Sequence, residues 1–203
     1  MNIKKFLPGL PFVALVAACV VACATATVTE PSACDSQPVS FPTPAIPAVN
    51  VNCSSLPSVT IPSESTTTQI DLSNTLSKLQ SVASNLNVNI TNLSIDNTNG
   101  EFDWVSGVTV MVSAPNLPMK QLATYTMPDG GATSELTPQV TMSPSDVFNY
   151  LSSGPVTLTI TLDGQSVTAC QAQQALNAVA DGGFNTNVNL CLSASGTVTK
   201  TLP

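Results

Sequence analysis

Every second residue between positions 156 and 162 is aliphatic, and each residue between them is threonine. A period of two places alternate side chains on opposite faces of a strand, so this pattern predicts a strand with one buried and one solvated face. Residues 108–112, 86–95 and 188–192 show a similar alternation, and a slip of phase at residues 91–92 indicates a β-bulge. Such strands, separated by Gly, Asn, Asp and Pro turns, predict a mainly β fold: an antiparallel β-sandwich of about seven to nine short strands.

Two or three short helices are expected beside the strands. The segment 143–154 begins with Ser143 as an N-cap and Pro144 at the first helical position, and it ends at Gly154. Apolar residues three and four apart predict another helix over residues 72–86 and a third over residues 172–179. No internal repeat divides the chain, so we assign these elements to one β-sandwich domain, residues 58–203.

The N-terminal residues have the composition of an export signal. Lys4 and Lys5 precede an apolar run over residues 6–24 that ends in small residues, which is the order found in secretory signal peptides. We therefore assign residues 1–22 to a signal peptide. The alternative is an uncleaved membrane anchor, because a run of this length can just span a bilayer.

The end of this run resembles the lipobox of bacterial lipoproteins, in which an aliphatic residue, a small residue and Gly or Ala precede a cysteine. Residues 20–23 and residues 16–19 both fit, with valine where the family usually has leucine. The resemblance is confined to the leader and implies a membrane anchor through an acylated Cys23, or alternatively Cys19. Ala24, in place of aspartate, implies the outer membrane. Ordinary cleavage after Ala26 would instead release a soluble, extracellular protein.

Six cysteines are present in the chain. Lipidation at the second lipobox cysteine leaves four, which can all pair in an oxidising compartment, whereas lipidation at the first leaves an odd number. These four are Cys34, Cys53, Cys170 and Cys191. Of the three pairings that four cysteines allow, we expect the local one, Cys34–Cys53 with Cys170–Cys191.

Proline is concentrated between residues 30 and 65, where seven occur among Ser and Thr residues. Proline at this density blocks helices and favours extended polyproline II, so we assign residues 23–57 to a lipid-anchored Pro/Ser/Thr-rich tether. Phe41, Val49 and Val59 are too apolar for a pure linker. Part of the tether is therefore expected to pack on the domain as edge strands, where proline is tolerated.

Charged residues make up 8% of the chain, and histidine and arginine are absent. The chain has twelve acidic residues and five lysines, and two of the lysines lie in the leader. It therefore has no basic patch that could bind the phosphates of a nucleic acid. Without histidine there is no Ser-His or Cys-His pair and no imidazole metal ligand. Ser-x-x-Lys, G-x-S-x-G and phosphate-loop motifs are missing as well. We therefore expect a protein without enzymatic activity and without a cofactor.

Three features remain as candidate sites. Asp96, Glu101 and Asp103 flank an Asn-Gly turn and offer oxygen ligands for calcium, although the register of an EF-hand is missed by one residue. Glu101 and Asp103 would share a face on a strand, which is the arrangement for a catalytic carboxylate pair. Trp104, the only tryptophan, is either a core residue or a platform for sugar stacking, and its phase with residues 108–112 favours the core.

Together these observations favour an exported lipoprotein of the cell envelope, at the outer membrane or cell surface. Its β-sandwich would act by binding or as a structural element, without catalysis. The sparsely charged polar surface suits a glycan or another envelope protein as partner. Two alternatives stay open: a soluble secreted adhesin-like or glycan-binding module, and a hydrolase that uses Glu101 and Asp103.

Overall fold

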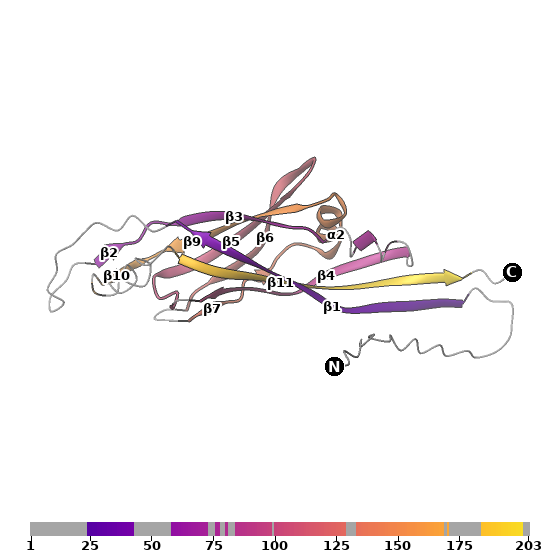
Figure 1. The fold of residues 1–203 in the computed structure, drawn as a ribbon, viewed down its shortest axis with the longest axis horizontal. Helices are drawn as coiled ribbons and strands as arrows, with labels where there is room; N and C mark the ends of the chain where they lie inside the picture. Colours follow the sequence, from indigo (N-terminus) through magenta and orange to yellow (C-terminus); the bar gives the residue numbers. More distant parts are fainter. Residues whose placement is uncertain are drawn as a thin grey trace, which may run out of the picture.

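Two antiparallel sheets packed face to face make up the body of the protein, which confirms the predicted β-sandwich (Figure 1). The computed structural model describes residues 24–42, 58–72, 76–77, 80, 84–98, 100–128, 133–168, 170 and 184–200. Each paired strand runs antiparallel to its neighbour. The core between the sheets is built from the aliphatic residues that alternate along the strands.

The first sheet has five strands in the order β3-β9-β5-β6-β8. Their bounds are β3 (Glu64–Ile70), β9 (Val156–Gly164), β5 (Val105–Ala114), β6 (Leu117–Thr126) and β8 (Gln139–Val140). The alternation that predicted β9 also explains its packing. Its aliphatic residues at 156, 158, 160 and 162 are buried, whereas the threonines between them lie on the outer face of the sheet.

The second sheet has four strands in the order β1-β11-β4-β7. Their bounds are β1 (Ala24–Phe41), β11 (Phe184–Lys200), β4 (Ser84–Asn97) and β7 (Glu135–Leu136). The predicted bulge is confirmed, because Cys191 pairs with Asn92 and Leu192 pairs with Ile90, which leaves Thr91 as the extra residue. The bulge changes the phase of β4, so that Leu93 is buried like Val88 before it.

A short two-stranded pair continues one end of the sandwich. It joins β2 (Ser58–Thr60) to β10 (Ser166–Thr168), which lie together at the end opposite to the start of β1 (Figure 1). The chain passes from β9 into β10 through Gly164. A Cβ atom at this glycine would lie 2.0 Å from the carbonyl oxygen of Ile61, so only glycine allows this close approach.

The helix predicted after residue 143 is also confirmed. It is α2 (Pro144–Ser152), and it packs against β4 and β5, one strand from each sheet. Val147, Tyr150 and Leu151 are its buried residues. The Tyr150 hydroxyl donates to the carbonyl oxygen of Pro118 at 2.5 Å, which fixes the helix against the start of β6. The helix therefore covers the space between the two sheets on one side.

The start of α2 gives a test of local stability. Ser143 Oγ accepts a hydrogen bond from the backbone N–H of Asp146 at 3.3 Å and donates to the Asp146 carboxylate at 2.7 Å. Ser143→Ala should lower the free energy of unfolding by about 1 kcal/mol, the usual cost of losing an N-cap, as measured by urea unfolding. Ser152→Ala, at the exposed C-terminal end, is the matched control. Equal effects of the two changes would contradict the capping role.

The boundary between tether and domain requires a correction. Residues 24–41, which we assigned to the tether, form β1, so the sandwich begins before residue 58. The expectation that part of this stretch packs as an edge strand holds for β1, which is the edge of its sheet. The remaining tether residues, from 43 to 57, lie outside the described residues.

Both prolines of β1 occupy positions where an edge strand can accept them. The Ser40 carbonyl accepts from the Thr66 hydroxyl of β3, so the backbone groups of Ser40 point away from β11. Pro38, two residues earlier, has the same orientation, and its missing N–H therefore costs no bond to β11. Pro31 lies in the irregular pairing between Glu30 and Ala33. Prolines at the edge of a sheet are common in natural proteins, and these two discourage another strand from pairing with this part of β1.

The number and length of the strands differ from the expectation. Eleven strands are found among the described residues, and three of them are long, with 18, 14 and 17 residues in β1, β4 and β11. Strands of two or three residues, such as β7 and β8, are too short to show a period in sequence. Of the helices predicted over residues 72–86 and 172–179, most residues lie outside the described part of the chain.

Candidate functional site

Trp104 belongs to the core and not to a binding surface. Its exposed fraction is 2%, and its neighbour Phe102 is fully buried. A platform for sugar stacking must present a ring face to solvent, so the stacking role is wrong and the alternative, a core residue, is confirmed. The sequence signal for a core position was that Trp104 falls on the same alternation as the buried residues of β5.

Glu101 and Asp103 lie in the turn before β5 and not on a strand, so the shared strand face that we expected is wrong. The amide of Val105 donates to the carbonyl of Phe102, which closes this turn. Glu101 is exposed and Asp103 is half-buried. Burial raises the pKa of Asp103, and the neighbouring charge of Glu101 raises it further. Gln165 Nε2 donates to the backbone carbonyl of Asp103 at 2.7 Å. This hydrogen bond holds the turn in place and does not involve the side-chain carboxylate of Asp103.

The raised pKa of Asp103 makes stability depend on pH. As the pH rises above 3.8, the ordinary pKa of an aspartate, Asp103 loses its proton in the unfolded chain before it does so in the folded protein. The free energy of unfolding therefore falls as the pH rises from 3.8 to the raised pKa of the folded protein. Asp103→Asn should therefore increase the free energy of unfolding at neutral pH and flatten this fall. Urea unfolding between about pH 3 and pH 8 measures the difference. Glu101→Gln removes only the neighbouring charge, so it should increase the free energy of unfolding in the same direction and more weakly. A difference in stability between Asp103→Asn and the wild type that does not depend on pH would contradict the raised pKa of Asp103.

The calcium candidates are not gathered into one group. Asp96 lies on β4, and its carboxylate accepts hydrogen bonds from Ser94 and Asn189, whereas Glu101 and Asp103 lie in the turn before β5. Within the described ranges, no cluster of three acidic, cysteine or histidine side chains could hold a metal ion. The arrangement therefore gives no support to a calcium site.

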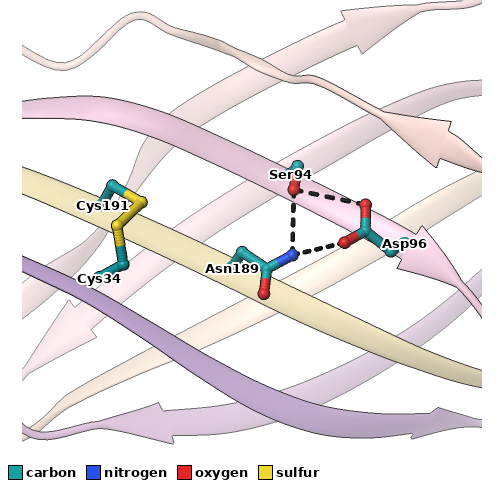
Figure 2. Close-up of a disulfide and its surroundings, with 5 residues drawn as sticks. All are labelled: Cys34, Ser94, Asp96, Asn189 and Cys191. Atoms are coloured by element: carbon teal, nitrogen blue, oxygen red, sulfur yellow. Dashed lines mark hydrogen bonds between the residues drawn. A yellow bond between two sulfur atoms is a disulfide. The ribbon is translucent and has the colours of Figure 1, made fainter.

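A disulfide joins the two longest strands on the outer face of the four-stranded sheet. Cys34 of β1 and Cys191 of β11 stand directly opposite each other, with 4.0 Å between their Cα atoms (Figure 2). Both predicted pairings, Cys34–Cys53 and Cys170–Cys191, are therefore wrong. Cys170 is disulfide-bonded as well, and Cys53 lies outside the described residues. The local pairing fails because the antiparallel ladder brings together two residues that are 157 positions apart.

The outer face of β4 and β11 is lined by amides and hydroxyls, and we call it the amide face. Asparagine occupies every second position of residues 87–89 and of residues 185–189, and serines follow further along both strands. The members are Asn87, Asn89, Asn92, Ser94 and Asp96 of β4, and Asn185, Asn187, Asn189, Ser193, Ser195 and Thr197 of β11. Asp96 is the one charged residue among these members. The alternation of asparagine is a sequence signal for a polar face on each strand, but it does not show that the two strands are neighbours.

Asp96 is held within the amide face by its neighbours. Asn189 Nδ2 donates to Asp96 Oδ2 at 2.5 Å and to Ser94 Oγ at 3.1 Å, and Ser94 Oγ donates to Asp96 Oδ1 at 3.4 Å (Figure 2). Ser94 is buried beneath this network. The serine therefore helps to orient the carboxylate. The amides of the remaining asparagines provide both donors and acceptors.

The space between the sheets is filled by side chains. A cavity of about 20 Å³ lies between α2 and the two sheets, lined by apolar residues that include Ile90, Val112, Val147 and Leu190. This volume corresponds to about one water molecule, whereas sites for small molecules enclose roughly 300–1,000 Å³. This cavity is therefore too small for a small-molecule ligand.

The residues that would carry the lipid lie outside the described part of the chain. Cys23, Cys19 and the predicted signal peptide all precede residue 24, where the description begins. In the parts that are described, no helix is both long enough and apolar enough to cross a bilayer. No family model, curated protein or solved structure matches this chain.

Proposed function

We propose that this protein is an exported lipoprotein of the cell envelope, acylated at Cys23, whose β-sandwich acts by binding or as a structural element. The observation that carries the proposal is the Cys34–Cys191 disulfide downstream of a lipobox. Structural disulfides form and persist in oxidising compartments, so the crosslink agrees with export. The lipobox then accounts for retention at a membrane, and Ala24 after Cys23 favours the outer membrane.

A non-catalytic role is supported by how the polar residues are used. The Asp96 carboxylate is occupied by Asn189 and Ser94, and Asp103 lies half-buried in a turn that Gln165 braces. The amide face offers donors and acceptors with a single carboxylate among them, which suits a neutral hydroxyl-rich partner such as a glycan, or the polar surface of another envelope protein. We propose this face as the interaction surface.

Metabolic labelling with radioactive palmitate tests the proposal. The full-length protein, expressed in a bacterium that processes lipoproteins, should incorporate label, and Cys23→Ala should abolish it. Cys19→Ala is the matched control and should leave the label in place, since Cys19 belongs to the part that is removed. Label that survives Cys23→Ala would move the anchor to another residue, and a protein without label would refute the lipoprotein.

A further inference from the structure

The two large sheets have four edges, and three of them carry features that oppose pairing with another strand. The β1 edge contains Pro31 and Pro38. At the opposite edge of that sheet β7 has only two residues, and α2 packs against β4 beside it. In the five-stranded sheet β8 also has two residues, and the part of β6 that β8 leaves unpaired carries Pro118 and Lys120. Short edge strands, prolines, lysines and covering helices are the means by which natural proteins prevent edge-to-edge pairing.

β3 is the fourth edge, at the rim of the five-stranded sheet, and it lacks these features (Figure 1). Its seven residues include no proline, glycine or lysine, and its one charged residue, Glu64, stands at the first position. Its register with β9 is continuous over all seven residues, whereas the pairs β1–β11, β4–β11 and β5–β6 contain shifts of register. Ser65, Thr67 and Gln69 are exposed. β3 is therefore a regular strand of ordinary length with an unprotected edge.

The contact between β3 and β1 is made from the inner face of the sheet. Thr66 stands opposite Ile160, a buried residue of β9, so its side chain points toward the other sheet. Its hydroxyl donates to the carbonyl oxygen of Ser40 at 3.0 Å. Within the described part of the chain no backbone hydrogen bond joins β3 to β1, and β9 is the only strand that pairs with β3. The backbone edge of β3 can therefore accept another strand.

The sequence of β3 is complementary to itself in an antiparallel pair. Two copies that meet at Thr67 pair over the whole strand, and the pairs are Thr67–Thr67, Thr66–Thr68, Ser65–Gln69 and Glu64–Ile70. Threonine favours strands, and cross-strand pairs of threonine stabilise a sheet. The two copies of Glu64 lie about 20 Å apart along the strands. Asp71, which follows the strand, comes opposite Ser63. No two like charges therefore stand directly opposite each other.

We propose that the β3 edge is a dimerisation surface, at which β3 of a second copy of this chain pairs antiparallel and joins the two five-stranded sheets into one. The pair has a two-fold axis at Thr67, and two-fold dimers are the commonest oligomers of soluble proteins. The inference goes beyond the proposed function and does not depend on it, because β3 contains no residue of the lipobox or of the amide face. The axis is perpendicular to the joined sheet, so both amide faces lie on the same side of the dimer.

Cysteine crosslinking of the full-length protein tests the pairing and its register. With Thr67→Cys, the two new cysteines stand opposite each other, with Cα atoms about 4.5–5.5 Å apart, which is within reach of a disulfide. With Gln69→Cys, the matched control on the same strand and face, the two copies lie about 14 Å apart, which is too far. On non-reducing gels we expect several-fold more covalent dimer from Thr67→Cys. Equal yields, or no dimer from Thr67→Cys, would overturn the pairing.

Charge substitution tests the same surface without a crosslink. Size-exclusion chromatography with light scattering, in detergent, should give the mass of a dimer that dissociates on dilution. Ser65→Lys, Thr67→Lys and Gln69→Lys together place three pairs of lysines opposite each other, so the dissociation constant should rise by about tenfold or more. The same positions changed to glutamate should have a similar effect. An equimolar mixture of the lysine and glutamate variants should form heterodimers, which also shows that both variants are folded.

The control for net charge is a variant with lysines at three exposed positions outside β3: Ser58→Lys, Ser152→Lys and Ser166→Lys. It should keep the dissociation constant of the wild type. A wild type that is monomeric at every concentration, or a dimer that the three lysines of β3 leave intact, would overturn the inference. Either result would leave the proposed lipidation and the amide face unaffected.

Discussion

Replacing Cys34 and Cys191 together with alanine should lower the free energy of unfolding by about 3–5 kcal/mol. The crosslink closes a loop over a sequence separation of 157 residues, and the chain-entropy model gives about 5 kcal/mol for a loop of this length. The second disulfide, at Cys170, shortens the effective loop if its partner lies within it, which is why the lower part of the range is included. Guanidinium unfolding of the oxidised wild type and of the double variant measures the difference.

The matched control is the double change Ser36→Ala and Ser193→Ala. These serines lie on the same two strands and on the same face as the disulfide, and their loss should alter stability by less than about 0.5 kcal/mol. A disulfide variant as stable as this control would contradict a structural role for the crosslink.

Trp104→Ala should lower the free energy of unfolding by about 3–5 kcal/mol, because it removes the largest side chain of the core and leaves a cavity. Trp104→Phe keeps an aromatic ring in place and should cost less. As Trp104 is the only tryptophan, its fluorescence gives a second readout. Emission at short wavelength and slow quenching by acrylamide are expected for a ring with an exposed fraction of 2%.

Met119→Ala is the control for this change. Met119 is an exposed apolar residue, with an exposed fraction of 56%, and its truncation should alter stability by less than about 0.5 kcal/mol. A Trp104→Ala protein that keeps the stability of the wild type would contradict the assignment of this residue to the core.

Strands with a clear period of two were predictable from sequence, and so was the helix with a complete N-terminal signal. The buried aliphatic residues of β9, the bulge at Thr91 and the cap at Ser143 are local patterns, each contained within a few neighbouring residues. Physical rules that act over such short distances can be read from the order of residues alone. For this reason the β-sandwich followed from the sequence.

Features that depend on pairing between distant segments were not predictable in the same way. The disulfide was assigned to neighbours in sequence, yet Cys34 meets Cys191 because β1 and β11 pair over most of their lengths. The prolines of β1 indicated a tether, and only the position of β1 at the sheet edge explains why the strand tolerates them. The amide face requires β4 and β11 to be neighbours, which their alternating asparagines do not specify.

Peptide mapping by mass spectrometry, without reduction, of the protein purified from a host that exports and processes it is the most direct test of the account. We expect a mature chain that begins at Cys23 and carries acyl chains on it. We also expect the peptide that contains Cys34 to be linked to the peptide that contains Cys191. A mature chain that begins at Thr27, or that keeps its first 22 residues and has free thiols at Cys34 and Cys191, would contradict it.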